Sequence, residues 1–219
     1  MEKIKQVILK YRHAWVLLYG LIYIPWFLYL EKREGVQYYL IHSPLDNYIP
    51  FIEYFIVPYL LWFIFIFVTA FYFFLTSRTD FYRMAAFMCT GMTLFLIICT
   101  IFPNGLNLRP HTFARDNIFT NMVKVLYQTD TPTNVLPSIH VFNSLSAVIA
   151  IAHSSSLKKH KYIKGSAYGL AVLIILSTVF LKQHSVTDVI AAFAAACIIY
   201  PFVYATEHKK ATKLSHQLT

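Results

Sequence analysis

Charged residues are scarce in this chain, and their distribution decides its class. Only 13% of the 219 residues are Asp, Glu, Lys or Arg, against about a quarter in a typical soluble domain. Almost all of them lie in short clusters between long apolar runs, and 58% of the chain is hydrophobic. A soluble helical protein would need each of these long helices to be apolar on every side. The sequence therefore predicts an integral membrane protein, with one domain over residues 1–219.

The sequence also has few cysteines, and clusters of acidic residues and internal repeats are missing from it. The three cysteines, Cys89, Cys99 and Cys197, fall inside apolar runs, where they serve as small packing residues and exclude a disulfide framework or a cysteine metal site. No internal repeat stands out. Basic patches with interleaved aromatics are missing outside the segments that flank the apolar runs. The net charge of +9 is therefore not interpreted as nucleic-acid binding.

Six apolar runs approach the ~20 residues needed to cross a bilayer core. They lie near residues 14–30, 54–76, 84–102, 138–156, 165–182 and 185–205. The fourth run is the weakest, because it carries polar residues such as Ser138, His140 and Asn143. We therefore predict an all-α fold, a polytopic membrane bundle of six transmembrane helices. A stripe of alanines between 191 and 196 predicts that the last helix packs closely and lies centrally.

Lys and Arg fall mainly on one side of these six runs, and this bias predicts the orientation. Thirteen of the nineteen basic residues lie in the N-terminal segment, the loops 77–83 and 157–164, and the C-terminal tail. Both termini are therefore predicted to be cytoplasmic, in a protein of the cell membrane. The first run is too long for a signal peptide, and no small-residue cleavage site follows it, so it is interpreted as a retained span.

Three sets of polar residues come together on the predicted extracytoplasmic face. Arg109 follows the third run, Ser138 and His140 begin the fourth, and His184 and Asp188 begin the sixth. Polar residues at the edge of a span are costly and need a reason. Each set alone has an ordinary explanation: a structural clamp for the His–Asp pair, an interfacial histidine, or an arginine that contacts lipid headgroups. Their convergence on one face favours a functional site.

The spacing within these sets suggests acid–base and nucleophilic chemistry on a phosphate. His184 and Asp188 are four residues apart and would share one face of a helix. The carboxylate could then orient the imidazole and leave one ring nitrogen free to attack. His140, at a separate helix start, could protonate a leaving group. Helix N-termini also suit a bound phosphate.

These residues resemble the three sequence blocks of the PAP2 superfamily of type 2 phosphatidic acid phosphatases. Those blocks read Lys-x6-Arg-Pro, Pro-Ser-Gly-His and Ser-Arg-x5-His-x3-Asp. The corresponding segments here run from Phe102 to Arg109-Pro110, from Pro137 to His140, and from Ser177-Thr178 to His184 and Asp188. The order and spacing match, and the six-span layout is similar to that of the membrane members. The Pro-Ser-Ile-His form of the second block is similar to the inositol-phosphorylceramide-synthase-like branch.

The resemblance implies a role for each matching residue. His184 would attack phosphorus to form a phosphohistidine, Asp188 would hold it, and His140 would be the general acid. Arg109 and Ser138 would bind phosphate oxygens, and Ser177 of the third block is placed with these substrate-binding residues. No metal or cofactor would be needed.

Two phosphate-binding cations of the family are replaced, by Phe102 and Thr178. Lys182 is predicted to supply one positive charge from another position. Asn104, Asn107 or His111 is predicted to contribute hydrogen bonds near Arg109.

We therefore expect a membrane lipid phosphatase that hydrolyses a phosphate or pyrophosphate monoester of a lipid, such as a phosphatidate or a polyprenyl pyrophosphate, at the outer face. One alternative is a lipid phosphotransferase that passes a phosphoryl group or phospho-headgroup to a lipid or glycan alcohol. Another is a non-catalytic lipid-binding or transport protein on the same fold. The sequence leaves the acceptor and the oligomeric state open.

Overall fold

The computed structural model describes residues 2, 6 and 9–204, which are almost entirely helical. The described residues form seven α-helices: α2 (Gly20–Glu31), α3 (Ile56–Thr76), α4 (Arg78–Ile101), α5 (Ile118–Thr129), α6 (Ile139–His153), α7 (Lys161–Phe180) and α8 (Val186–Tyr204). Three 3-10 segments accompany them: η1 (Arg12–Tyr19), η2 (Pro44–Asn47) and η3 (Glu53–Phe55). Two-residue strands β1 (Tyr39–Leu40) and β2 (Asn104–Gly105) pair in parallel. The all-α prediction is confirmed apart from this small ladder.

Five helical segments are long and apolar enough to cross a membrane. They cover Arg12–Glu31, Glu53–Thr76, Arg78–Ile101, Lys161–Phe180 and Val186–Tyr204. The predicted fourth run, 138–156, is a helix of 15 residues, α6, which is apolar but shorter than the other five. The helical membrane bundle is therefore confirmed, whereas the count of six spans is not.

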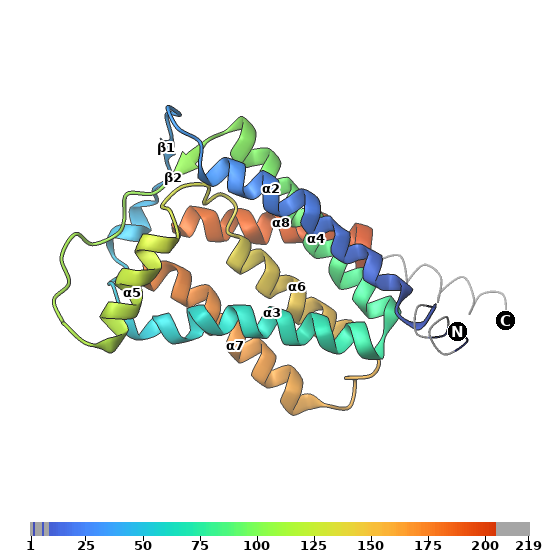
Figure 1. The fold of residues 1–219 in the computed structure, drawn as a ribbon. Coiled ribbons are helices and arrows are strands. Elements are labelled where there is room, and N and C mark those ends of the chain that lie inside the picture. Colours follow the sequence, from blue (N-terminus) through green and yellow to red (C-terminus); the bar gives the residue numbers. More distant parts are fainter. Residues whose placement is uncertain (1, 3–5, 7–8, 205–219) are drawn as a thin grey trace.

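Helix α6 lies in the middle of the bundle, where it packs against α3, α4, α7 and α8. Figure 1 shows that α6 and α8 begin at the same end of the molecule, near β1, β2 and α5. The turn between α3 and α4 and the loop between α6 and α7 lie at the opposite end. The basic residues predicted for the extreme termini (Lys3, Lys5, Lys209, Lys210 and Lys213), and residue 205 of the last predicted run, lie outside the described residues.

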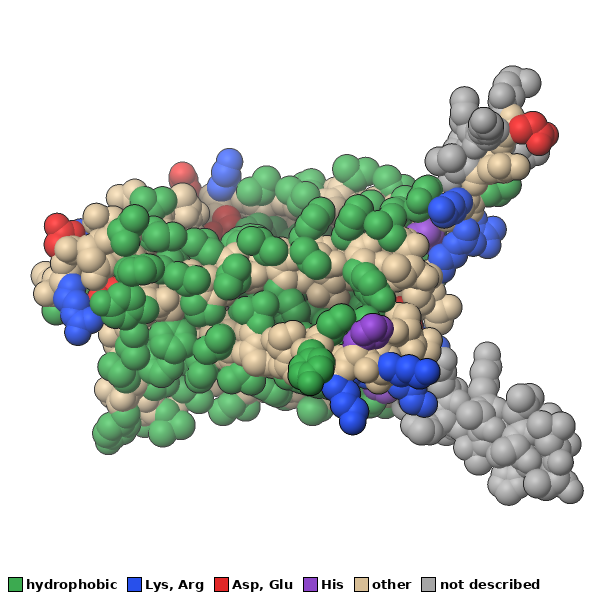
Figure 2. All heavy atoms as spheres, turned by 90° about the horizontal axis from the view of Figure 1, so that it is seen from below, with side chains coloured by type: hydrophobic (Ala, Val, Ile, Leu, Met, Phe, Trp, Pro, Cys, Tyr) green, Lys and Arg blue, Asp and Glu red, His purple; other side chains and the backbone are tan. Residues whose placement is uncertain are grey.

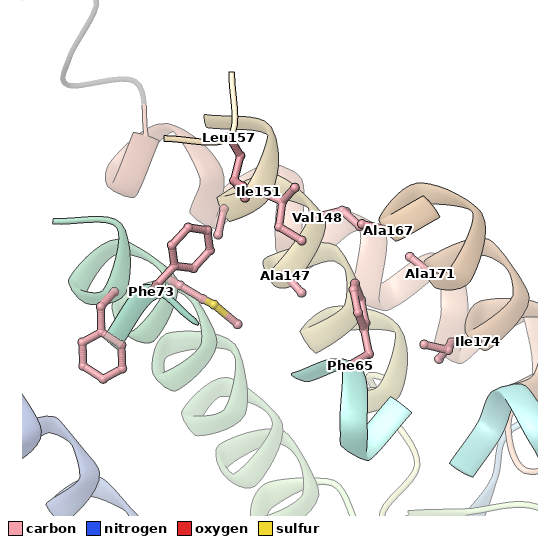
Figure 3. Close-up of a cluster of buried hydrophobic side chains, with 12 residues drawn as sticks. Phe65, Phe73, Ala147, Val148, Ile151, Leu157, Ala167, Ala171 and Ile174 are labelled. Carbon is pink, nitrogen blue, oxygen red and sulfur yellow. The ribbon is translucent and has the colours of Figure 1, made fainter. Parts of the chain in front are cut away.

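Close packing in the centre depends on small residues and buried aromatic rings. A methyl group at Gly91 of α4 would lie only 2.0 Å from Cε1 of Phe142 in α6. The Phe142 ring therefore fits only because Gly91 has no side chain. A second cluster joins α3 and α4 to α6 and α7, with Phe73, Ala147 and Ile174 among its buried members (Figure 3). These contacts fix the position of α6, and hence that of His140 at its start.

The outer surface fits a membrane environment. Apolar side chains remain exposed along the long helices, including Ile22 on α2, Phe67 on α3 and Ile198 on α8. In Figure 2 hydrophobic side chains cover the middle of the body, and most Lys, Arg, Asp and Glu side chains lie toward its two ends. Large exposed apolar surfaces are rare on soluble monomers. The protein is therefore an integral membrane protein.

Candidate active site

His140 is the second residue of α6, and its ring lies against two aromatic rings of α3. Its ring centroid is 4.6 Å from that of Tyr59 and 4.4 Å from that of Trp62. The His184 ring is also close, with its centroid 5.8 Å from that of His140. Nδ1 of His140 has no hydrogen-bond partner within the described chain. Tilted ring contacts therefore hold the imidazole in place and leave this ring nitrogen available for a proton or a ligand.

His184 and Asp188 form a pair at the start of α8, although not both on the helix as the sequence suggested. His184 precedes the helix, which begins at Val186. Its Nδ1 lies 3.3 Å from Oδ2 of Asp188. The pair still forms because the Asp188 side chain turns back toward the helix start, where the same oxygen accepts a 2.9 Å hydrogen bond from the Ser185 amide. Both side chains are buried, with 7% and 0% exposed.

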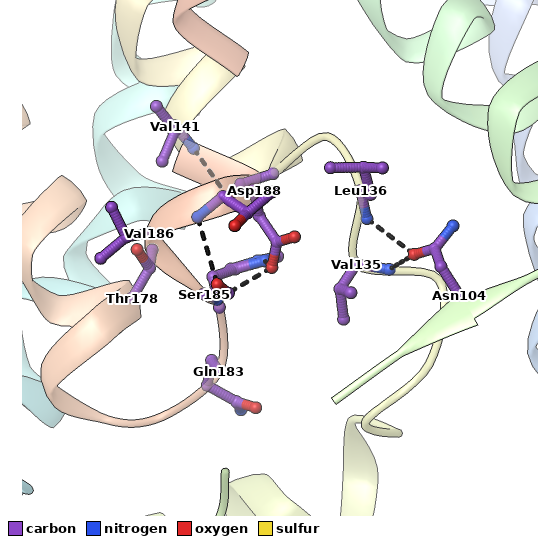
Figure 4. Close-up of polar contacts among 12 residues, drawn as sticks. Asn104, Val135, Leu136, Val141, Thr178, Gln183, Ser185, Val186 and Asp188 are labelled. Carbon is purple, nitrogen blue, oxygen red and sulfur yellow. Dashed lines mark hydrogen bonds and ion pairs between the residues drawn. The ribbon is translucent and has the colours of Figure 1, made fainter. Parts of the chain in front are cut away.

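Ser185 and Asp188 cap the start of α8, as Figure 4 shows. Oγ of Ser185 accepts from the amide of Thr187 at 3.1 Å, and Asp188 accepts from the Ser185 amide. This reciprocal arrangement is a capping box. Asp188 thus has two structural contacts, one with the backbone and one with His184. Its backbone carbonyl also accepts from the Ser138 amide at 3.2 Å, which joins the starts of α6 and α8.

Asp46 of η2, far away in the sequence, completes this cap. Its carboxylate accepts a 2.6 Å hydrogen bond from the Ser185 hydroxyl and a 2.9 Å hydrogen bond from the Val186 amide. Asp46 is only 3% exposed. The first amides of α8 are thus already engaged by the protein. A phosphate would therefore meet this end of α8 through His184, not through the helix amides as the sequence suggested.

Lys182 turns the chain between α7 and α8. Its φ of 55° lies in the left-handed region, and the Lys182 and Gln183 amides donate to the carbonyls of Val179 and Thr178. This is a Schellman motif, whose left-handed position is usually glycine. The ammonium group donates to the carbonyls of Asp46 at 2.8 Å and Ile49 at 2.6 Å. The structure thus places the Lys182 ammonium group on the loop that carries the Asp46 cap.

Arg109 is held by a network that the sequence did not predict. Nη1 donates to the Tyr127 carbonyl at 3.2 Å, and Nη2 donates to Oε1 of Gln183 at 2.5 Å. The guanidinium also lies over the Tyr127 ring, 4.5 Å from its centroid. Nε is buried without a partner in the described residues. Burial lowers the pKa of Arg109, but a guanidinium stays charged in proteins.

Asp130 connects this network to the aromatic wall behind His140. Its Oδ2 accepts from Nε2 of Gln183 at 3.3 Å and from the Tyr59 hydroxyl at 3.2 Å. Burial raises the pKa of Asp130, and the nearby His184 and Arg109 lower it to a smaller extent. Asp130 is thus a half-buried carboxylate in the electrostatic range of both a predicted catalytic histidine and the predicted phosphate-binding arginine.

Three other predicted residues have their polar groups engaged inside the protein. Oδ1 of Asn104 accepts from the amides of Val135 and Leu136 at 2.8 and 2.9 Å (Figure 4), and its Nδ2 donates to the Phe102 carbonyl. Ser177 is buried and donates to its own helix. Ser138 is the N-cap of α6, its Oγ accepting from Val141 at 3.4 Å.

The structure therefore brings His140, His184, Asp188 and Arg109 to one end of the bundle. Lys182 and Asn104 bind loop backbone, and Ser177 bonds within α7. Sequence reasoning missed the residues that hold these groups, namely Asp46, Tyr59, Trp62, Tyr127, Asp130 and Gln183. Ser185 was also missed, although the Ser-x-x-Asp spacing at 185–188 is a readable local signal of a helix start. The others come from distant segments with no pattern of their own.

Comparison with known protein families gives one match. The sequence model of the PAP2 superfamily matches residues 84–211, more than half of the chain. The match begins within α4, covers α5 to α8 and includes all three blocks. No curated protein and no solved structure was found to match.

Proposed function

The chain belongs to the PAP2 superfamily, and on that premise we propose that it is a membrane phosphatase of lipid phosphates that works through a phosphohistidine. Membership implies phosphatase or phosphotransferase activity on phosphate esters. The observation that carries the proposal is the placement of two histidines, one in the first turn of α6 and one just before α8, with ring centroids 5.8 Å apart and one of them paired with a buried aspartate.

The pairing of His184 assigns the two nitrogens of its ring. Nδ1 faces the Asp188 carboxylate, so this nitrogen carries the proton and Nε2 keeps the lone pair. Nε2 of His184 attacks phosphorus, an N–P bond forms, and the P–O bond to the leaving group breaks. Asp188 stabilises the positive charge that develops on the ring. Its burial strengthens this interaction, because water cannot screen it.

His140 is the second member of the acid–base pair. In the first step its protonated ring donates a proton to the departing oxygen. In the second step the neutral ring takes a proton from water, the water oxygen attacks phosphorus, and the N–P bond to His184 breaks. The products are an alcohol or phosphate and free inorganic phosphate. Tyr59 and Trp62 fix the orientation of His140 by tilted ring contacts, so the ring need not be ordered during the reaction.

Arg109 is the phosphate-binding cation of this proposal. Tyr127 and Gln183 hold its two terminal nitrogens, which leaves the buried Nε–H for a phosphate oxygen. Lys182 and Asn104 act indirectly, because their polar groups bind the backbone of the loops that lead to His184 and His140. The hydroxyl of Ser177 bonds within its own helix. We propose a lipid substrate because the site lies at the end of a bundle with long apolar helices, where an amphiphile can approach sideways. A phosphatidate or polyprenyl pyrophosphate fits this access.

We further propose that both termini are cytoplasmic and that the site faces outward, in the cell membrane. The bias of Lys and Arg toward the opposite end supports this orientation.

A phosphotransferase is the second candidate, because it shares every step up to the phosphohistidine. The acceptor would then be a lipid or glycan alcohol in place of water. The replacement of the second-block glycine by Ile139 favours this candidate, because the same form occurs in the branch that the sequence resembles.

Radiolabelled phosphatidate and polyprenyl pyrophosphate provide the test, each supplied to the purified protein with and without a lipid alcohol. We expect acid-labile, base-stable label on the wild-type protein and none on His184→Ala. Free phosphate as the main product supports the phosphatase, and a labelled lipid formed only with the alcohol supports the transferase. Absence of both release and transfer, in a protein that is folded, would refute the enzymatic proposal.

A further inference from the structure

The first span and α4 run side by side (Figure 1), and each faces the other with a row of residues that begins with arginine. In the 3-10 helix η1, residues three apart lie one above another, so Arg12, Trp15 and Leu18 form one row. On α4, residues four apart share a face, and Arg78 comes one turn before Tyr82. Each row thus starts with a cation and continues with an aromatic ring.

A hollow of about 550 Å³ lies between the two rows, a size typical of sites that hold small ligands, ~300–1,000 Å³. Its apolar and aromatic walls include Trp15, Leu18, Ile22, Tyr82, Ala86 and Cys89. A second hollow of about 420 Å³ begins at the same Cys89 and follows α4 to Ile97. Together they form the α4 groove. Residues 82–97 of a helix cover roughly 22 Å, which exceeds the ~15 Å that one leaflet contributes to the hydrocarbon core. The groove is therefore long enough for a lipid chain.

Trp15 and Tyr82 bridge the α4 groove at the end that carries the arginines. Nε1 of Trp15 donates to the Tyr82 hydroxyl at 3.2 Å, which joins η1 to α4. Tyr82 is the acceptor in this bond, so its own O–H can still donate to another oxygen. Trp and Tyr are enriched at the level where lipid headgroups meet the hydrocarbon core. The two rings therefore mark the headgroup level, with the apolar part of the groove beneath them.

The charge at this end of the α4 groove is positive. Lys10, Arg12 and Arg78 are exposed there. Nη2 of Arg78 donates to the Lys10 carbonyl at 2.8 Å, which holds the start of η1 against the start of α4. The acid in this part of α4, Asp80, is buried and accepts a 2.9 Å hydrogen bond from the Ser154 hydroxyl. A phosphate at the headgroup level would therefore meet arginine side chains.

We propose that the α4 groove binds one acyl chain of an anionic phospholipid whose phosphate lies beside Arg12 and Arg78. Tyr82 donates its O–H to an ester or phosphate oxygen of this lipid. The turn between α3 and α4 lies at the end of the molecule opposite to the starts of α6 and α8 (Figure 1). The lipid thus belongs to the leaflet away from the candidate active site and is not its substrate. Because it contacts both rows, it fastens the first span to the bundle.

A second copy of the chain fits this face less well than a lipid does. Copies in one membrane share one orientation, so a partner would bring its own basic residues to the level of Arg12 and Arg78. Like charges at that level repel one another, whereas an anionic headgroup neutralises them.

Phosphatidylglycerol and phosphatidylcholine with the same acyl chains test the choice of an anionic lipid. The full-length protein in detergent micelles would be titrated with each lipid, and the retained lipids counted in native mass spectra. The thermal midpoint provides a second readout, because a ligand that binds only the folded state raises it. Wild type should bind phosphatidylglycerol more tightly, on the order of tenfold. A phosphatidylglycerol with a diazirine in its acyl chain should label residues 15–22 and 82–97.

Two variants separate the cationic and the apolar parts of the site. Arg12→Gln should weaken phosphatidylglycerol binding about fivefold and leave phosphatidylcholine binding unchanged. Its matched control is Lys158→Gln, which removes a charge from an exposed residue at the same end of the molecule and should change neither. Ala86→Phe fills the groove and should weaken the binding of both lipids. Its control, Ala194→Phe, places the same ring at an exposed position of α8 and should bind as wild type does.

Four results would overturn the proposal: equal affinity for the two lipids, label spread over all the spans, equal effects of Arg12→Gln and Lys158→Gln, or equal effects of Ala86→Phe and Ala194→Phe. A dimer mass that appears in place of the bound lipid would assign the face to a second copy instead. Arg12 is exposed, so its variant decides the matter even where Ala86→Phe does not fold. None of these measurements uses turnover, and their outcome is therefore independent of the proposed function.

Discussion

The carboxylate of Asp46 accepts a 2.6 Å hydrogen bond from the hydroxyl of Ser185, a residue 139 positions later in the chain. Asp46 lies in η2 and Ser185 caps α8, so a loop between the first two spans closes the start of the last one. The same cap holds Asp188 and, through it, His184.

Asp46→Ala should therefore impair activity although Asp46 is far from the reacting atoms. The change removes the acceptor for the Ser185 hydroxyl and the Val186 amide, at a cost typical of a lost helix cap, about 0.5–2 kcal/mol. The resulting shift of His184 should lower kcat about ten- to a hundredfold. Phosphatidate turnover would measure it, with Asp116→Ala as the control, since the side chain of Asp116 is 84% exposed. Unchanged kcat would show that the cap does not position the histidine.

Gly91→Ala tests the contact between α4 and α6. The added methyl group would fall 2.0 Å from the Phe142 ring, so one of the helices must move. We expect a loss of about 1–3 kcal/mol of stability and a lower rate, because Phe142 follows His140 by two residues. Gly169→Ala is the control: it lies in α7 with open space around its Cα. The thermal midpoint of Gly169→Ala in detergent should equal or exceed that of wild type. A midpoint for Gly91→Ala as high as that of wild type would contradict the packing described.

Asn104→Ala should destabilise the segment that leads into α6. It leaves the buried amides of Val135 and Leu136 without their acceptor, at about 1–3 kcal/mol for each unsatisfied group. Asn104→Asp keeps an acceptor oxygen and should recover part of the loss. Hydrogen exchange at residues 133–138 would follow the opening, with the exposed Asn107 changed to Ala for comparison. Equal protection in all variants would show that Asn104 is dispensable.

Asp130→Asn should change how stability depends on pH. Burial raises the pKa of Asp130 in the folded protein above its value in the unfolded chain, so folding favours the protonated form. As pH rises from the ordinary aspartate pKa of about 4 through the raised folded value, wild type should lose stability relative to Asp130→Asn. Thermal midpoints of both proteins between pH 4 and 8 would show the difference growing with pH. A difference that shrinks would mean that ion pairing outweighs burial at this site.

The predictable features of this molecule are those written in local sequence. Apolar runs of about 20 residues predict spans because nothing else satisfies the backbone in a bilayer, and five of the six runs appear as helices long enough to cross it. The fourth run has its helix, but it ends at His153, three residues before the predicted boundary.

The supporting residues could not be predicted in this way. Gln183, for example, bonds to Arg109 and Asp130, which are 74 and 53 positions away. Such pairings follow from how the loops fold over the helix ends, and no spacing encodes them. For the same reason the ammonium group of Lys182 was expected at the phosphate, whereas two carbonyls of another loop bind it in the structure.

The shortness of α6 has a consequence for the loop that precedes it. A helix of 15 residues is about 22 Å long, whereas the hydrocarbon core is about 30 Å thick. At least one end of α6 therefore stops at a depth that water reaches only through the protein. Irregular backbone survives there only if the protein itself supplies its hydrogen-bond partners. Insertions between residues 133 and 138 should accordingly be tolerated less well than insertions in ordinary surface loops. Polar side chains around this segment, such as Asn104, supply hydrogen bonds to its backbone groups.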